Sequence, residues 1–309
     1  MKVKHFIEPN DLALNEYEEI FRLADNILIQ PEAYLSRCQG KILASLFFEP
    51  STRTRISFET AMLRLGGQVI SVTDPKVSSV AKGESLADTL RILEGYADIC
   101  AMRHPENFTP HQVAPYLSQM NLINAGDGSN AHPTQTLADI LTIREAKGGL
   151  EGLKIGFCGD LKYGRTVHSL FKFMEQMEGN SFYLISPEAL ALAPSFYDYV
   201  DPGRVQVVGE LAECIGDLDV LYMTRIQKER FEDPREAEAL RGSYLLDTEK
   251  MKLAKKDLAV LHPLPRVDEI SQEVDDDPRA LYFRQAKLGM VGRMALITYL
   301  LEAKDGGKR

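Results

Sequence analysis

Short apolar runs alternate with helical patterns along the whole of this 309-residue chain. A run of four to eight apolar residues followed by a helical pattern is typical of strand–helix units, and the crossover helix makes successive strands parallel. The runs that we interpret as strands are Ile42–Phe47, Gln68–Thr73, Ala97–Met102, Asn121–Ala125, Lys154–Cys158, Ser181–Ile185, Val205–Val208, Leu218–Met223 and Leu258–Leu261. This alternation predicts parallel sheets with helices on both faces.

The length of the chain predicts two domains, at roughly 150 residues per domain. We place the boundary at the start of a helical pattern at 134–147, so that the expected domains are 1–133 and 134–285. The sequence of the last helix does not decide which half it packs on, and we assign residues 286–309 to the first domain. The expected fold is α/β, with two doubly wound parallel-sheet domains and the active site between them.

The charge of the chain excludes some classes of partner. It carries 36 Lys and Arg against 45 Asp and Glu, a net charge of −9. No net positive field draws such a protein to nucleic acid or to an anionic membrane, although a local group of arginines can still bind a small anion. The sequence has no apolar run long enough for a transmembrane helix and no apolar signal core near residue 1.

The cysteines favour a cytoplasmic protein with reduced thiols, because they are widely spaced and never form a C-x-x-C pair. They are Cys38, Cys100, Cys158 and Cys214. Without paired cysteines or a second spaced histidine beside His132, we expect no metal site. A Ser-His-Asp triad is also unsupported, since the chain has no G-x-S-x-G motif.

Polar and cationic side chains follow six of the predicted strands. Ligands of open α/β sheets bind beyond the carboxyl ends of the strands, so these segments together predict a binding site. The segments are Glu49–Arg55, Arg103–Pro105, Gly126–Gly128 with His132–Gln135, Gly159–Thr166, Thr224–Gln227 and His262–Arg266.

The strongest single motif is the run Ser51-Thr52-Arg53-Thr54-Arg55 at the start of a helix. The N–H groups of a first helical turn have no partners within the helix, and arginine adds paired donors that match phosphate oxygens. Helix capping by Ser51 or Thr52 is the alternative for one hydroxyl, but the whole run favours phosphate binding. Arg55 could instead be a structural ion-pair partner, for example of Glu49.

The segment Gly159–Thr166 has the G-x-x-x-x-G spacing of a nucleotide-binding loop, but Arg165 stands where that loop has lysine. We favour a second interpretation, in which Arg165 binds a carboxylate. A dinucleotide cofactor is not expected, because no G-x-G-x-x-G motif is present.

These motifs resemble, in order and over nearly the whole chain, those of the aspartate and ornithine carbamoyltransferases. The matching segments are Ser51–Arg55, Ser78 with Lys82–Glu84, Met102–Pro105, His132–Gln135, Tyr163–Thr166, Thr224–Gln227 and His262–Arg266. Phe47–Pro50 and Pro263 resemble the branch that uses aspartate, since the ornithine branch usually has cysteine at the position of Pro263. In the loop before Lys82, Ser79 is an alternative to Ser78.

The resemblance implies transfer of a carbamoyl group from carbamoyl phosphate to the α-amine of L-aspartate, an early step of pyrimidine synthesis. It implies that the first domain binds carbamoyl phosphate and the second binds aspartate. The phosphate contacts would be Ser51, Thr52, Arg53, Thr54 and Arg103. Thr54, Arg103 and His132 would donate to the carbonyl oxygen, and with Arg53 they form the implied catalytic set. The carbamoyl group would also contact Gln135 and the backbone of Pro263 and Leu264.

The two carboxylates of aspartate would be bound by Arg165 and Arg225, with help from Gln227. Lys82, with Ser78, would reach into a neighbouring subunit's site and contact both substrates, which implies a homotrimer. No cofactor is implied and no side chain is an obvious general base, so the departing phosphate would accept the proton. An ornithine carbamoyltransferase and a non-catalytic carbamoyl-phosphate-binding relative remain alternatives, and the sequence does not decide whether regulatory chains bind.

Overall fold

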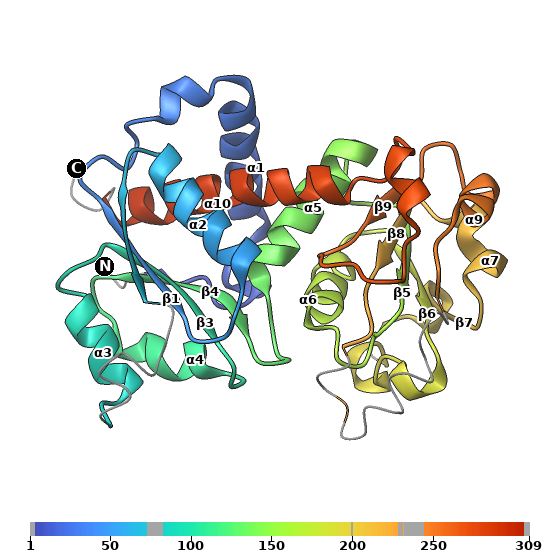
Figure 1. Cartoon of the computed structure of the whole chain (residues 1–309), viewed down its shortest axis with the longest axis horizontal. Helices are drawn as coiled ribbons and strands as arrows, with labels where there is room; N and C mark the ends of the chain where they lie inside the picture. Colours follow the sequence, from blue (N-terminus) through green and yellow to red (C-terminus); the bar gives the residue numbers. More distant parts are fainter. Residues whose placement is uncertain (1–3, 73–82, 199, 228–230, 232–243, 306–309) are drawn as a thin grey trace. The chain divides into compact units, whose positions relative to one another are not determined.

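The structure of the chain is a computed structural model that describes residues 4–72, 83–198, 200–227, 231 and 244–305 (Figure 1). The chain divides into two compact units, one formed by residues 1–138 and 287–309 and the other by residues 139–286. The division falls inside two helices, α5 (Pro133–Lys147) and α10 (Tyr282–Asp305), because both contribute residues to each unit. The sequence placed the first boundary five residues earlier, directly after Pro133, the first residue of α5.

Unit 1 is built on a four-stranded parallel sheet with the order β2-β1-β3-β4. Its strands are β1 (Ile42–Phe47), β2 (Gln68–Val72), β3 (Ile99–His104) and β4 (Asn121–Asp127). β1 and β4 are buried almost throughout, as expected for strands covered on both faces.

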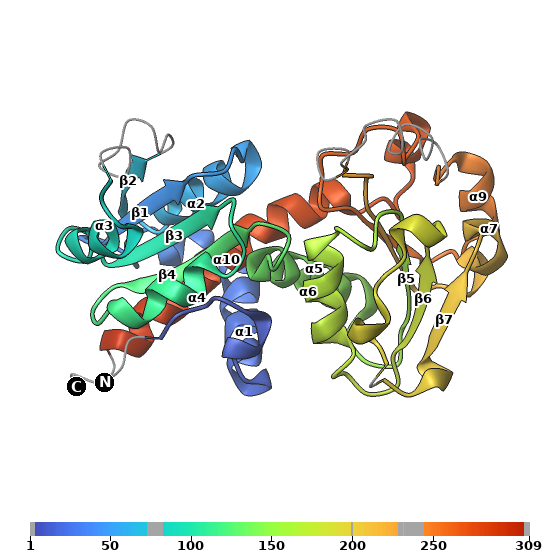
Figure 2. The same cartoon turned by 90° about the horizontal axis from the view of Figure 1, so that it is seen from below.

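Helices cover both faces of this sheet (Figures 1 and 2). The helices of the unit, besides α5 and α10, are α1 (Leu14–Ile29), α2 (Thr52–Arg64), α3 (Leu86–Leu93) and α4 (Thr109–Val113). Ala44 and Leu46 of β1 pack with Leu90 of α3 and Val113 of α4. Ser45, between them, points to the other face, where its hydroxyl donates to Glu59 of α2 at 3.0 Å. Alternate residues of one strand therefore serve opposite helical layers.

Unit 2 has a five-stranded parallel sheet with the order β7-β6-β5-β8-β9. Its strands are β5 (Lys154–Cys158), β6 (Ser181–Ile185), β7 (Val205–Val208), β8 (Val220–Met223) and β9 (Ala259–Leu261). Its further helices are α6 (Arg165–Met174), α7 (Leu211–Cys214) and α9 (Thr248–Leu253). Each predicted strand is present within two residues of its predicted start and end, which confirms the fold class of two parallel α/β sheets.

The two faces of the sheet in unit 2 carry separate buried clusters. Phe157 of β5 contacts the rings of Phe171 on α6 and Phe182 on β6, with centroids 6.0 and 6.4 Å apart. On the opposite face, Leu211 of α7 and Met251 of α9 pack in a separate buried cluster. Short 3-10 helices connect these elements at Pro9–Asp11, Pro31–Tyr34, Ala114–Tyr116, Glu188–Leu190, Pro194–Phe196, Pro202–Arg204, Ile215–Asp217 and Gln272–Asp276.

Candidate active site

Each sheet has a point at which the chain reverses its direction of travel across the sheet. In unit 1 this point lies between β1 and β3, and in unit 2 it lies between β5 and β8. The loops that leave neighbouring strands there diverge to opposite faces and open a crevice at the carboxyl edge, where ligands of such folds bind. Ser51–Thr54 follow β1 and Arg103 is the penultimate residue of β3, whereas Arg165 follows β5 and Arg225 follows β8. The predicted residues therefore lie at both reversal points.

The N-terminus of α2 presents hydroxyl and guanidinium groups that helix capping does not use. Ser51 occupies the N-cap position, with extended backbone angles (φ −158°), yet its side chain makes no capping hydrogen bond. Thr52 and Arg53 are exposed, and Thr54 is half-buried. The alternative of simple capping is therefore wrong for Ser51. The N–H groups and the positive end of the helix dipole remain directed outward, as an anion site requires.

Arg103 is held beside this helix terminus by an ion pair. Its Nε donates to Oε2 of Glu49 at 3.0 Å, and the two side chains are 11% and 23% exposed. The backbone N–H of Phe48 donates to the carbonyl of Arg103 at 2.9 Å, so the ends of β1 and β3 are tied together. Glu49, which the sequence offered as a partner for Arg55, thus pairs with Arg103 and orients it next to Ser51.

β4, whose carboxyl end lies beside that of β3, leads to His132 and Gln135. The N–H of Gly128 donates to the carbonyl of His104 at 3.0 Å, which joins the end of β4 to the end of β3. His132 directly precedes α5 and is 5% exposed, and its carbonyl accepts the N–H of Gln135 at 2.9 Å. Gln135 is half-buried in the first turn of α5. His132 and Gln135 therefore lie at the same carboxyl edge as Ser51 and Arg103.

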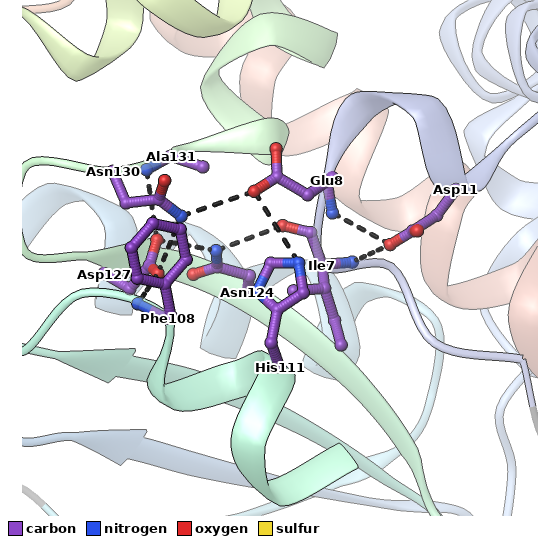
Figure 3. Close-up of polar contacts among 9 residues, drawn as sticks. All are labelled: Ile7, Glu8, Asp11, Phe108, His111, Asn124, Asp127, Asn130 and Ala131. Carbon is purple, nitrogen blue, oxygen red and sulfur yellow. Dashed lines mark hydrogen bonds and ion pairs between the residues drawn. The ribbon is translucent and has the colours of Figure 1, made fainter. Parts of the chain in front are cut away.

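A buried carboxylate shapes the turn before His132. Figure 3 shows the side chain of Asp127 among Phe108, Asn124, Asn130 and Ala131, which direct nitrogen atoms at it. Asp127 lies in the segment Gly126–Gly128 that was predicted to border the site, but no role of its own was predicted for it, because an aspartate in a glycine-containing turn commonly caps the turn.

In unit 2, Asp160 ties the loop after β5 to the loop after β8. Its carboxylate accepts the N–H of Tyr163 at 2.9 Å and the N–H of Gln227 at 3.0 Å, and the Gln227 amide donates to the Tyr163 carbonyl at 2.6 Å. Burial raises the pKa of Asp160, while these hydrogen bonds and the nearby Arg225 act in the opposite direction. An aspartate in this loop opposes a phosphate there, so the nucleotide-loop interpretation is not supported.

Two arginines lie on either side of this connection. Arg165 is the first residue of α6 and is half-buried. Arg225 is half-buried two residues after the end of β8, and its Nη1 donates to the carbonyl of Ile226 at 3.2 Å. Gly159 lets the two loops approach, because a Cβ atom there would lie 2.1 Å from the carbonyl oxygen of Thr224. The three predicted residues Arg165, Arg225 and Gln227 are therefore neighbours at the reversal point of unit 2, between β5 and β8.

A buried histidine supports the segment after β9. His262 is buried: its Nδ1 accepts the N–H of Leu264 at 2.8 Å, and its Nε2 contacts Glu269 at 2.6 Å. Leu264 has a positive φ of 51° and precedes a cis peptide bond to Pro265. Proline has no N–H, and the N–H of Leu264 is engaged, so Pro263 and Leu264 offer acceptors to a ligand.

Burial lowers the pKa of His262, although the hydrogen bond with Glu269 acts in the opposite direction. The accepted N–H identifies the tautomer as one protonated at Nε2, and this proton is donated to Glu269. Burial alone would raise the pKa of Glu269, but hydrogen bonds from His262 and from the N–H of Val267 lower it. The pair is thus a neutral imidazole that supports Leu264 and a carboxylate that orients it.

Several other predictions concern single residues. Ser78, Ser79 and Lys82 lie outside the described residues. The four cysteines are buried and free of disulfides, and burial raises the pKa of Cys38 and of Cys214 to about 11. In the described part of the chain, no group of three or more His, Cys, Asp or Glu side chains is arranged to hold a metal ion. Among those same residues, no helix is both long and apolar enough to cross a membrane.

Comparisons with known proteins match both halves of the chain. Residues 4–145 match the family model "Aspartate/ornithine carbamoyltransferase, carbamoyl-P binding domain", and residues 151–300 match "Aspartate/ornithine carbamoyltransferase, Asp/Orn binding domain". An aspartate carbamoyltransferase catalytic subunit of Clostridium botulinum (strain Langeland) is 55% identical over 305 residues, covering 97% of this chain and 99% of the relative. One from Lachnoclostridium phytofermentans is 53% identical over 303 residues, with 97% and 98% coverage.

Solved structures agree with these relatives. The catalytic subunit of M. jannaschii aspartate transcarbamoylase superposes with a TM-score of 0.89 at 48% identity, covering 98% of this chain and 99% of that one. Aspartate transcarbamoylase from Trypanosoma cruzi, in complex with carbamoyl phosphate and aspartate, has a TM-score of 0.89 at 38% identity, with coverage of 96% and 97%.

Proposed function

The chain belongs to the aspartate/ornithine carbamoyltransferase family, and we propose that it transfers the carbamoyl group of carbamoyl phosphate to the α-amine of L-aspartate. The products are N-carbamoyl-L-aspartate and phosphate, and the reaction serves pyrimidine synthesis. The observation that carries the proposal is the N-terminus of α2, where the N-cap hydroxyl of Ser51 does no capping and Arg103 is held alongside.

Carbamoyl phosphate binds in unit 1. Ser51, Thr52, Arg53 and Thr54 bind its phosphate with the first-turn N–H groups of α2, and Arg103 adds a second guanidinium. Thr54, Arg103 and His132 donate to the carbonyl oxygen, and Gln135 binds the carbamoyl amino group. Support comes from the common position of these residues at the carboxyl edge of β1, β3 and β4.

The attack of the amine builds negative charge on the carbonyl oxygen, and departure of the phosphate places further charge on the leaving group. Fixed donors that are already oriented stabilise both charges without reorganisation. Arg53 and Arg103 stabilise the charge on the departing phosphate, while His132 and Thr54 stabilise the charge on the carbonyl oxygen. The departing phosphate accepts the proton of the attacking amine, so no side chain is required as a general base.

L-Aspartate binds through its two carboxylates to Arg165 and Arg225, with Gln227 assisting. The carbonyls of Pro263 and Leu264 accept hydrogen bonds from the carbamoyl amino group and the attacking amine. The second arginine selects aspartate over ornithine, because a guanidinium attracts the side-chain carboxylate of aspartate and repels the ammonium of ornithine. Support comes from the hydrogen bonds through Asp160 and Gln227 that fix both arginine-bearing loops.

The experiment is an assay of carbamoyl transfer to aspartate and to ornithine with the same purified protein. We expect turnover with aspartate and none above background with ornithine. Turnover with ornithine alone would assign the chain to the other branch of the family. Binding of carbamoyl phosphate by calorimetry without turnover of either amine would identify a non-catalytic relative.

The active assembly that we propose is a homotrimer in the cytoplasm, in which Lys82 and Ser78 of one subunit complete the site of the next. Support for a subunit interface comes from Ile56 and Leu63, which are 50% and 60% exposed on one face of α2, and from Ile70 on the edge strand β2. Regulatory chains are a further candidate partner of this trimer.

Shared sites are testable by mixing two inactive variants. Arg53→Ala and Lys82→Ala damage different halves of a shared site, so some mixed trimers contain an intact one. We expect recovery of activity in trimers whose mixed composition is verified by mass spectrometry. Verified mixed trimers without activity would refute the role of Lys82 across the interface.

A further inference from the structure

The carboxylate of Asp127 accepts four hydrogen bonds although it is wholly buried (Figure 3). Oδ1 accepts the side-chain amide of Asn124 at 2.9 Å and the backbone N–H of Ala131 at 3.1 Å. Oδ2 accepts the backbone N–H of Phe108 at 2.8 Å and the side-chain amide of Asn130 at 3.0 Å. An ionised carboxylate offers about four lone-pair positions, so these donors use its full capacity.

These four donors come from the segments that surround His132. Ala131 directly precedes His132, and its carbonyl accepts the N–H of Asp127 at 3.2 Å, which closes the turn from both sides. Asn124 lies within β4, and Phe108 precedes α4. The single carboxylate therefore joins the strand, the turn and the neighbouring loop at the point where the backbone enters His132.

Phe108 shows how strongly this carboxylate constrains its surroundings. Its φ of 62° lies in the left-handed region, which a phenylalanine rarely adopts. Its N–H nevertheless points at Oδ2 of Asp127, so the hydrogen bond to a charged acceptor maintains this backbone geometry. On the other side, Asn130 also contacts Glu8 at 3.3 Å, which extends the support to the N-terminal segment.

We propose that Asp127 is a positioning residue that holds the imidazole of His132 where it donates to the carbonyl oxygen of carbamoyl phosphate. This inference rests on the proposed function, since it assigns to Asp127 an effect exerted through His132. Asp127 can act on His132 through the backbone, because the hydrogen bond from the N–H of Ala131 to Oδ1 of Asp127 fixes the residue directly before the imidazole. A shift of this backbone moves the donor away from the developing charge, where small displacements are costly.

The test is a double-mutant cycle with Asp127→Asn and His132→Ala. An asparagine keeps the shape but turns an NH₂ group toward N–H donors, so at least one hydrogen bond is lost. We expect kcat to fall by about 100-fold, the scale on which a displacement of about 1 Å acts. We expect the KM for aspartate to stay within about twofold, because Arg165, Arg225 and Gln227, which we propose bind the two carboxylates of aspartate, lie in unit 2. In the His132→Ala background, Asp127→Asn should cost less than about threefold, since the two changes act through one group.

Asp98→Asn is the matched control. Asp98 accepts the N–H of Ile42 at 2.9 Å at the amino ends of β1 and β3, away from the carboxyl ends where the candidate residues lie, so its change should affect stability and leave kcat unchanged. Asn130→Ala removes one of the four donors at a half-buried position. If Asp127→Asn does not fold, Asn130→Ala replaces it in the double-mutant cycle with His132→Ala.

Turnover is not the only readout. In protein labelled with ¹⁵N-histidine, the His132 signal, assigned by its loss in His132→Ala, should shift in Asp127→Asn and stay in place in Asp98→Asn. An unchanged signal, full kcat in Asp127→Asn, or an undiminished loss in the His132→Ala background would overturn the inference. A wild-type protein that fails to carbamoylate aspartate would instead overturn the proposed function, while the histidine signal still tests the link between Asp127 and His132.

Discussion

Replacing Gly159 with alanine should destabilise unit 2 more than any ordinary surface substitution. Gly159 directly follows β5 and has a φ of 116°, and a Cβ atom built there lies 2.1 Å from the backbone oxygen of Thr224. A side chain in a left-handed backbone conformation costs about 1–3 kcal/mol. Overpacking against backbone that cannot rotate away adds about 1–3 kcal/mol. The expected loss is therefore about 2–6 kcal/mol, a large share of the roughly 5–15 kcal/mol that stabilises a typical protein.

Two glycines of the same unit separate the contributions. Gly152 also has a positive φ, of 67°, but nothing lies within 4 Å of its Cβ position, so Gly152→Ala reports the backbone cost alone. Gly209 has neither a positive φ nor a neighbour within 4 Å, so Gly209→Ala should stay within about 0.5 kcal/mol of the wild type.

Urea denaturation followed by fluorescence or circular dichroism measures all three variants, and the KM for aspartate measures the site. We expect stability to fall in the order Gly209→Ala, Gly152→Ala, Gly159→Ala, with Gly159→Ala the least stable. We also expect a raised KM for aspartate in Gly159→Ala, because separating the two loops moves Arg225 away from Arg165. A Gly159→Ala protein within about 1 kcal/mol of the wild type would refute the reasoning that close approach to Thr224 requires glycine.

Three further predictions concern charge. Arg53→Ala should lower kcat by about 10²–10³-fold, as loss of one transition-state donor does, and a change confined to the KM for aspartate would contradict its role at the phosphate. Arg225→Ala should raise the KM for aspartate by about 10- to 150-fold, the equivalent of the roughly 1.5–3 kcal/mol of a hydrogen bond to a charged group, and an unchanged KM would exclude the contact. Burial lowers the pKa of His262 below its usual 6.5, so on acidification the unfolded state binds this proton before the folded state does, and stability should fall. Urea titrations from about pH 8 to about pH 5.5 should therefore show a falling free energy of unfolding, with a smaller fall in His262→Gln. An equal fall in both proteins would contradict the neutral buried imidazole.

The strands were predictable because their apolar runs are local and the sheets bury them on both faces. β1, β5, β6 and β7 match their predicted bounds, and α10 begins at Tyr282 where a helix was expected from about residue 286. Helix α1 was not identified in advance, although its pattern of buried residues is regular, because the segment contains no motif that drew attention to it. α4 and α7 are too short for a reliable helical pattern.

The position of the candidate residues was also predictable, because hydroxyls, arginines and a histidine follow the strands, and the strand ends of a parallel sheet meet at one edge. Their supporting residues were not. Glu49 pairs with Arg103 across 54 positions of the chain, and Asp160 accepts the N–H of Gln227 across 67. Contacts at such separations depend on which strands become neighbours, and a single aspartate or glutamate carries no signal of its distant partner.

The sequence by itself determined the two parallel sheets, the reduced cysteines as small buried side chains, and the kinds of group available to bind two anions. Those properties follow from local periodicity and from residue chemistry. Only the tertiary structure decided that β3 lies beside β1 and β8 beside β5, that Asp127 and Asp160 are buried carboxylates with several donors, and that His262 is a neutral support for Leu264. The physical reason is that burial and hydrogen-bond partners are properties of neighbours in space, which one residue's identity does not specify.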